Sequence, residues 1–234
     1  LHAEFTKNKV WVNTNDDGGW AVYRKSINYQ EADEYTKAYS QTFGSAVACG
    51  NTLGYLISDA TNGSIYRYTY DDISDSYIIT QTFTNNASFG STIAYSDDIV
   101  VVSEPTSGTP QVYVYQLVKN VLTNVLQSFQ SPITALGGST NWGSSLAISG
   151  DKKWLYISAV DLNRVYVYRR SQITDQYQYT TYITTSGLTA TDKFGFSIST
   201  DYYGDSVVIG APNHNSSDGI DDYGYAYVFN RIQQ

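Results

Sequence analysis

An aromatic residue followed by glycine recurs along this chain, and this repeat constrains the fold more than any other feature of the sequence. The four pairs begin at Phe43, Phe89, Trp142 and Phe194, with spacings of 46, 53 and 52 residues. A period of this length is typical of repeat architectures, in which each repeat is one supersecondary unit that buries its apolar face against its neighbours.

Short apolar runs separated by turn-forming residues follow each aromatic-glycine pair. The second run spans 55–58, 99–103, 154–158 and 207–210; the third spans 65–68, 112–115, 165–168 and 226–229; the fourth spans 77–83, 125–129 and 177–183. The third run places an aromatic residue at every second position, and a period of two is the pattern of a β-strand. With 23 tyrosines and no methionine, the composition also favours strands over helices.

The units at the two ends of the chain are incomplete. Residues 10–12, 20–23 and 35–43 match the second, third and fourth runs without the first, whereas residues 194–231 match the first three runs. We therefore expect an all-β fold, a single β-propeller domain over residues 1–234 with about five four-stranded blades, or a fragment of a larger propeller. The expected units are 9–43, 44–89, 90–142, 143–194 and 195–231.

Several ways of closing the ring are open at this point. The two partial units could complete one blade together, or neighbouring chains of a homo-oligomer or further sequence could supply the missing strands. Because the chain starts at Leu1 and contains no methionine, we expect it to be a processed or excised piece of a larger polypeptide.

The recurring residues have clear structural tasks in such a fold. Glycine after each aromatic residue allows two backbones to approach closely, and the aromatic side chain fills the space between adjacent sheets. The alternation of the third run predicts one set of side chains between blades and the other set towards solvent. We therefore interpret most tyrosines and tryptophans as packing residues.

The last unit carries the motif by which the chain resembles a known family. Phe194-Gly195, then Gly210-Ala211-Pro212 after a valine-rich run, and then 224–229 are similar to the FG-GAP repeat. This resemblance implies the β-propeller of integrin α subunits and of bacterial and viral surface proteins. A second resemblance, of 10–13 and 19–25 to tryptophan-rich segments of large bacteriophage virion proteins, points to a virion or surface protein.

Calcium sites of the integrin type do not carry over to this chain. Those sites need alternating carboxylates between the first two strands of a blade, and the connections here, such as 96–98, are too short or too poor in carboxylates. Two other loops are weak calcium candidates, although the same residues are ordinary in turns. The candidate ligands are Asn13, Asn15 and Asp17 in one loop, and Asp218, Asp221 and Asp222 in the other.

The loop 213–224 is the longest connection between second and third strands, which makes it the candidate binding loop. The residues that we expect to bind a partner there are Asn213, His214, Asn215, Asp218 and Tyr223. A solvated loop without a ligand is the alternative interpretation.

Composition and motifs argue against most chemistries. The formal charge of −8 disfavours nucleic acid, and the longest apolar run, 99–102, cannot span a bilayer. One cysteine, Cys49, precludes an internal disulfide, and only His2 and His214 could serve as a catalytic histidine. We therefore expect no catalytic residues and no cofactor apart from the weak calcium candidates.

These observations predict a non-enzymatic binding or structural module of a virion, cell-surface or extracellular assembly. Its expected partners are proteins or surface glycans. The alternatives are a carbohydrate-active enzyme (a glycoside hydrolase or lyase) that uses a pair of inward-facing carboxylates, and a lectin-like propeller. Glu104 stands out among the acids because it replaces the alanine of the Gly-Ala-Pro step, but we interpret it as an exposed charge beside Pro105.

Overall fold

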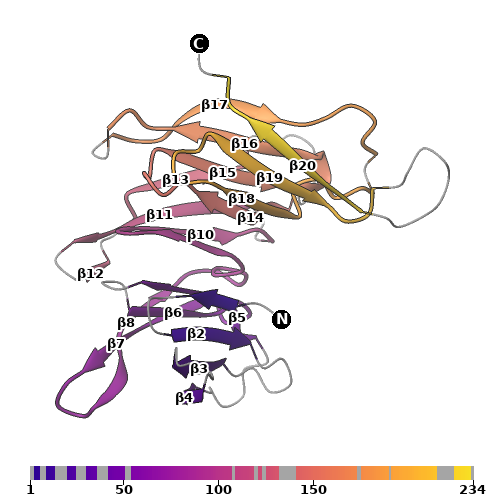
Figure 1. Cartoon of the computed structure of the whole chain (residues 1–234). Coiled ribbons are helices and arrows are strands. Elements are labelled where there is room, and N and C mark those ends of the chain that lie inside the picture. The colour runs from indigo at the N-terminus through magenta and orange to yellow at the C-terminus, as the bar shows by residue number, and fades with distance from the viewer. Residues whose placement is uncertain are drawn as a thin grey trace.

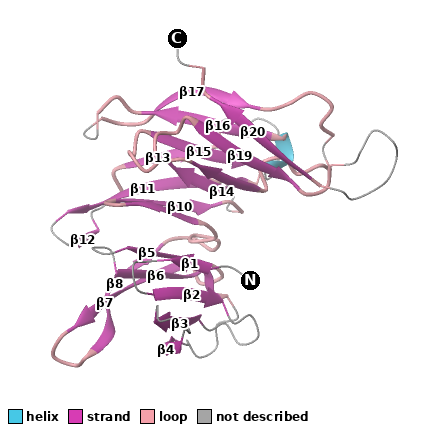
Figure 2. Ribbon diagram, in the orientation of Figure 1, coloured by secondary structure: helices cyan, strands magenta, loops and turns pink. Residues whose placement is uncertain are grey.

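The computed structural model describes residues 3–5, 9–13, 20–24, 30–35, 42–50, 54–106, 109–118, 121–122, 125–131, 141–172, 175–189, 191–214 and 224–232, with the backbone alone described up to residue 35. Within these ranges the chain forms antiparallel β-sheets, and its one helical element is the short 3-10 turn Val160–Leu162 (Figure 2). We number the sheets as blades 1 to 5 in chain order.

Each blade is built from strands that are consecutive in the sequence. Blade 1 contains β1 (Ala3–Phe5), β2 (Lys9–Asn13), β3 (Trp20–Arg24) and β4 (Gln30–Tyr35). Blade 2 contains β5 (Phe43–Gly50), β6 (Gly54–Asp59), β7 (Ser64–Asp71) and β8 (Ser76–Thr84). Blade 3 contains β9 (Ile93–Ser96), β10 (Ile99–Glu104), β11 (Gln111–Val118), β12 (Val121–Leu122) and β13 (Gln127–Gln130).

The last two blades follow the same order. Blade 4 contains β14 (Trp142–Ile148), β15 (Trp154–Ala159), β16 (Arg164–Arg169) and β17 (Gln178–Ile183). Blade 5 contains β18 (Ser197–Thr200), β19 (Ser206–Ala211) and β20 (Tyr225–Asn230).

The blades follow one another from the indigo N-terminal sheet to the yellow C-terminal sheet (Figure 1). Their first strands are neighbours in space: β1 lies beside β5, β5 beside β9, β9 beside β14, and β14 beside β18. Consecutive four-stranded units that meet along their first strands form a β-propeller. The predicted fold class is confirmed.

The N-terminal blade differs from the expectation that it lacks a first strand. β1 pairs antiparallel with β2, so blade 1 has four strands of its own. The sequence pattern missed β1 because residues 3–5 contain no aromatic-glycine pair. The C-terminal blade has the three strands that the pattern predicts.

The second and third strands of each inner blade are largely buried on both faces, whereas the fourth strands of blades 2 and 4 are largely exposed. We call the face towards the preceding blade the rear face and the face towards the next blade the forward face. On β16, Tyr166 and Tyr168 belong to the apolar cluster between blades 3 and 4, whereas Val165 and Val167 belong to the cluster between blades 4 and 5. The prediction that one set of alternating residues faces solvent is therefore wrong for this strand, because neighbouring blades cover both of its faces.

The aromatic-glycine pair has the packing role that the sequence predicts. Trp142 is fully buried, and its indole N–H donates to the carbonyl of Phe129 at 3.2 Å, which ties blade 4 to blade 3. Gly143 has φ +76°, and a Cβ on it would lie 2.7 Å from Val112 Cγ2 and 2.9 Å from Ser103 Cβ. No larger side chain fits at this point without a shift of blade 3.

A serine on the second strand accepts the backbone N–H of the third residue after the aromatic one in blades 2 to 4, and in blades 2 and 4 a bulge shifts the register of the first two strands at this point. Ser158 Oγ accepts the N–H of Ser145 at 2.8 Å, where the register of β14 and β15 shifts. Ser58 and Ser103 accept the equivalent N–H groups of blades 2 and 3. The bulge turns the residues after it towards the neighbouring first strands.

Candidate functional site

The first strands of blades 2 to 5 line a cavity of about 590 Å³ along the propeller axis. Its lining consists of residues 45–48, 91–95, 144–148 and 196–200, which are small, hydroxyl-bearing or apolar. None of these residues is an acid, a base, a histidine or a cysteine. This described part of the channel offers hydroxyl and backbone groups for hydrogen bonds and apolar side chains for contact.

Several hydroxyl groups of the channel strands already have partners. Ser45 Oγ lies 3.0 Å from Ser58 Oγ, and Ser144 Oγ lies 3.0 Å from Ser158 Oγ. Thr92 Oγ1 donates to the carbonyl of Ser144 at 3.0 Å and so links the first strands of blades 3 and 4. These contacts give the hydroxyl groups a structural role in the bulges and between blades.

A polar pair recurs where the chain enters the first strand in blades 2 to 5. One member precedes the buried aromatic residue, and the other is the last residue of the second strand or follows that strand. We call them junction pairs, and they are Thr42–Asp59 at 2.8 Å, Asn86–Glu104 at 3.0 Å, Asn141–Asp161 at 2.8 Å and Asp192–His214 at 2.9 Å. Each pair holds the start of a blade against the end of its second strand or the turn that follows it.

Glu104 is a junction-pair residue and not the exposed charge that the sequence suggested. Its side chain is 1% exposed, and its carboxylate accepts hydrogen bonds from Asn86 Nδ2 at 3.0 Å and the Tyr113 hydroxyl at 3.1 Å. A buried carboxylate needs such donors because its desolvation is otherwise unfavourable. The sequence around Glu104, which precedes Pro105, does not indicate these two hydrogen-bond donors.

The junction pair of blade 5 is the one that contains a histidine. His214 Nδ1 lies 2.9 Å from Asp192 Oδ2. The imidazole packs edge-on against the Tyr225 ring, with 4.7 Å between the ring centroids. Asp192 also accepts hydrogen bonds from the N–H and the hydroxyl of Thr189, at 2.6 and 2.8 Å. Burial alone would raise the pKa of Asp192, but these hydrogen bonds and His214 outweigh burial and lower it.

This arrangement leaves Nε2 as the imidazole nitrogen that could exchange a proton with a ligand. Among the hydrogen bonds of the described residues, none joins a hydroxyl nucleophile to Nε2 of His214. His214 was predicted as a binding-loop residue, whereas its partner Asp192 was missed. Asp192 is 22 residues from His214 in the sequence, and only the return of the chain to the same junction brings them together.

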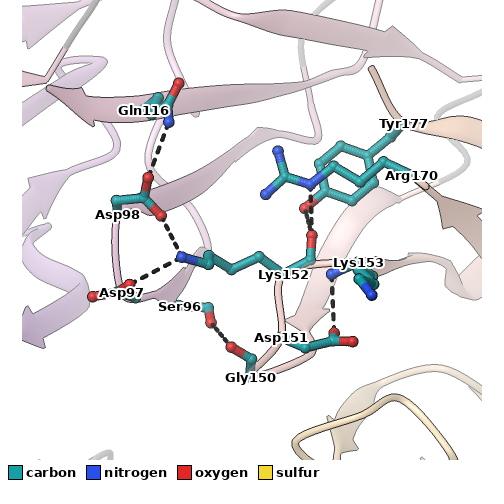
Figure 3. A network of polar contacts seen from close by, with 10 residues as sticks. All are labelled: Ser96, Asp97, Asp98, Gln116, Gly150, Asp151, Lys152, Lys153, Arg170 and Tyr177. Atoms are coloured by element: carbon teal, nitrogen blue, oxygen red, sulfur yellow. Dashed lines mark hydrogen bonds and ion pairs between the residues drawn. The ribbon is translucent and has the colours of Figure 1, made fainter. Parts of the chain in front are cut away.

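A second polar network lies where the turns between first and second strands of blades 3 and 4 meet (Figure 3). Lys152 Nζ donates to Asp97 Oδ2 and Asp98 Oδ1 at 2.9 Å each, and Gln116 Nε2 donates to Asp98 at 2.9 Å. The carbonyl of Lys152 accepts Arg170 Nε at 2.7 Å and the Tyr177 hydroxyl at 2.6 Å. Lys152 therefore joins both turns to the outer part of blade 4.

The charges of this network stabilise one another. Burial alone would lower the pKa of Lys152, but its bonds to Asp98 and Asp97 raise it. Burial alone would raise the pKa of Asp98, but Gln116 and Lys152 lower it. The carboxylates of the connection 96–98, which we considered too few for calcium, thus bind a lysine of the next blade.

Most of the remaining predicted site residues lie outside the described part of the chain. Asn15, Asp17, Asn215, Asp218, Asp221, Asp222 and Tyr223 lie outside the described residues, as does the side chain of Asn13, and Asn213 lies in the turn after β19. The described residues contain no cluster of three or more His, Cys, Asp or Glu side chains that could hold a metal ion. No helix in the same part of the chain is long and apolar enough to cross a membrane.

Comparison with known proteins finds similar folds among solved structures. No family model matches the chain, and no curated protein matches it. Among solved structures, it is similar to a functionally unknown protein from Desulfotomaculum acetoxidans, with 12% identity, a TM-score of 0.64 and coverage of 99% of this chain and 71% of that one.

Two further similar structures belong to proteins with names. Hsv2 of Kluyveromyces marxianus has 12% identity, a TM-score of 0.59 and coverage of 100% of this chain and 73% of its own. A candidate 6-phosphogluconolactonase of Bacteroides uniformis has 12% identity, a TM-score of 0.66 and coverage of 97% of this chain and 73% of its own. Likeness at this identity concerns the fold alone, and it agrees with a β-propeller.

Proposed function

We propose that this chain is a non-enzymatic binding or structural module of a virion, cell-surface or extracellular assembly, with proteins or glycans as partners. The observation that carries the proposal is the channel. Its described lining offers hydroxyl groups and apolar side chains but no group that could donate or accept a proton near neutral pH.

The buried carboxylates support the same function because structural contacts occupy them. Asp59 and Glu104 are buried and accept hydrogen bonds from side chains at the junctions of their own blades. An acid that serves a general acid-base reaction must instead reach a substrate. The FG-GAP resemblance adds the expectation of a surface location, since the family forms propellers of surface proteins.

The rival function is a carbohydrate-active hydrolase. One observation favours it: a carboxylate that holds Nδ1 of a histidine, as Asp192 holds His214, leaves Nε2 oriented for general base catalysis. The candidate 6-phosphogluconolactonase among the structural neighbours suggests lactones as substrates to test. A lectin-like propeller is the second alternative, and it would show a sugar preference without turnover.

One set of assays separates these functions. The full chain is applied to a glycan array and to a panel of lactones and glycosides, together with the variant His214→Gln. We expect retention of a glycan or protein partner and no turnover above the buffer rate. Turnover that the wild-type chain supports and His214→Gln loses would establish the hydrolase and overturn the proposal.

A further inference from the structure

The outer strand of blade 4, β17, carries two exposed tyrosines on one face. Tyr182 lies opposite Tyr166 in the ladder of β16 and β17, and Tyr179 lies opposite Tyr168. The register shifts between these two pairs, so Thr180 is the extra residue of a bulge and both tyrosines lie on the rear face. Tyr179 is 54% exposed and Tyr182 is 42% exposed, whereas the two tyrosines opposite them are buried.

This exposure does not arise at an end of the sequence. Blade 4 has all four of its strands, and blades 3 and 5 lie on its two sides. Blade 3 covers the third strand of blade 4 through the apolar cluster that contains Tyr166. The rings of Tyr179 and Tyr182 lie outside this cluster and contact Tyr166, with 6.1 and 6.0 Å between the ring centroids. They therefore form an open surface on a complete blade.

An arginine lies against this surface. The guanidinium carbon of Arg164 is 4.5 Å from the centroid of the Tyr182 ring. Among the described residues, no hydrogen bond or ion pair involves the Arg164 side chain, and the nearest acid in the sequence, Asp161, binds Asn141 at 2.8 Å instead. A guanidinium that stacks on a ring keeps the N–H groups at its edge available. These groups can donate two parallel hydrogen bonds to a carboxylate.

The combination of arginine and tyrosine belongs to blade 4 and not to the repeat. At the position of Tyr182, blades 2 and 3 have Thr82 and Ser128. At the position of Arg164, these blades have a serine and a glutamine. Since blades 2 and 3 form the same kind of sheet without them, packing of the blade does not account for the two residues.

The charge of this unit also differs from that of the whole chain. Residues 143–194 hold six of the 14 lysines and arginines but four of the 22 aspartates and glutamates. The unit is therefore positive, whereas the chain has a formal charge of −8. Charge complementarity favours an acidic ligand for the surface around Arg164 over a neutral or basic one.

The two exposed rings indicate the rest of the ligand. A sugar ring has one face of C–H groups that can pack on an aromatic ring, and hydroxyl groups that bond to water or to a tyrosine hydroxyl. We propose that Tyr179, Tyr182 and Arg164 bind a glycan that carries a carboxylate, with a sugar ring packed on the tyrosines and the carboxylate paired with Arg164. The inference rests on the proposed binding function, for which it names a class of glycan and the residues that recognise it.

The test compares ligands that differ in the carboxylate. The probes are hexagalacturonate and its methyl ester, and sialyllactose and lactose, because uronic and sialic acids are two sources of the same group. Isothermal titration calorimetry with the full chain measures the affinities. We expect saturable binding of at least one acidic probe, and binding of its neutral counterpart that is weaker by about tenfold or more. No binding of either acidic probe at millimolar concentration, or equal affinity for the acidic and neutral forms, would overturn the proposal.

Matched variants separate this site from a general effect of charge. Arg164→Gln and Tyr179→Leu should each weaken binding of the acidic probe by about tenfold or more, with unchanged circular dichroism. The control is Arg169→Gln, because Arg169 stacks on Trp154 at 5.2 Å on the opposite face of β16, and this variant should bind as wild type does. Equal losses in Arg164→Gln and Arg169→Gln contradict the site.

An acidic peptide tests the class of ligand. Hexaglutamate carries carboxylates without sugar rings, so we expect it to bind more weakly than the acidic glycan and to be insensitive to Tyr179→Leu. Equal affinity for hexaglutamate and the acidic glycan would make an acidic protein segment the occupant and overturn the glycan assignment. A chain that still captures glycans or proteins after these failures retains the proposed function and loses only this inference.

Discussion

Substitution of Gly143 by alanine tests whether close approach of blades sets the spacing of the propeller. Its positive φ costs an alanine about 1–2 kcal/mol. The new Cβ would also meet Val112 at 2.7 Å and Ser103 at 2.9 Å, and overpacking of this kind costs about 1–3 kcal/mol. The lower entropy of the unfolded alanine chain offsets about 0.4–1 kcal/mol.

Gly187 provides the matched control. It has φ +83°, close to the +76° of Gly143, but a Cβ at Gly187 would meet no atom within 4 Å. Gly187→Ala therefore carries the backbone cost without the contact, and the two variants should differ by about 1–3 kcal/mol in the free energy of unfolding. Urea denaturation followed by tryptophan fluorescence measures both. Equal destabilisation by the two substitutions would refute the argument that the glycine is needed for contact between blades.

Three further substitutions test the contacts between and within blades. Gln127→Ala should cost about 1–3 kcal/mol in urea denaturation, because it leaves a buried N–H and C=O unpaired, whereas the exposed Gln178→Ala should change stability by less than about 0.5 kcal/mol. Glu104→Ala should cost about 1–3 kcal/mol at pH 7 by the same assay, since two donors lose their acceptor, and a stability equal to wild type would contradict the junction-pair role. The folded pKa of Asp98 is lowered, so its ionised form stabilises the protein above about pH 4, and this stabilisation is lost as the pH falls through the folded pKa. Lys152→Met removes one cause of the lowered pKa, so the variant should lose less stability than wild type below about pH 4. The free energy of unfolding is measured against pH, and equal slopes for the two proteins would argue against this pairing.

The fold could be predicted because the repeat records the same physical requirement several times. An aromatic residue, a glycine and an alternating strand each have one packing role, and their repetition distinguishes that role from chance. Two predictions were wrong, for different reasons. β1 lacks the aromatic-glycine pair, and the alternation on β16 was interpreted as one-sided although both faces of that strand are covered.

The polar contacts could not be predicted because their partners are distant in the sequence. Gln127 binds the backbone of Tyr177 across 50 positions, and a glutamine in a strand has no local signature for such a bond. Glu104 follows a strand and precedes a proline, which is also the pattern of an exposed turn. Only the packing of the blade distinguishes a buried acid with two donors from a solvated one.

The same reasoning indicates where a binding surface can exist on this molecule. The second and third strands of blades 2 to 4 are largely covered by neighbouring blades, and most tyrosines of the third strands pack there. The fourth strands instead expose residues such as Tyr179 and Tyr182. Val208 and Val228 of blade 5 are equivalent to Tyr156 and Val167 of blade 4. The two valines are exposed, whereas their blade 4 equivalents are buried. The same repeat position is therefore buried between blades 4 and 5 on blade 4 and is exposed on blade 5. Position along the arc therefore decides whether the same repeat position is buried between two blades or exposed.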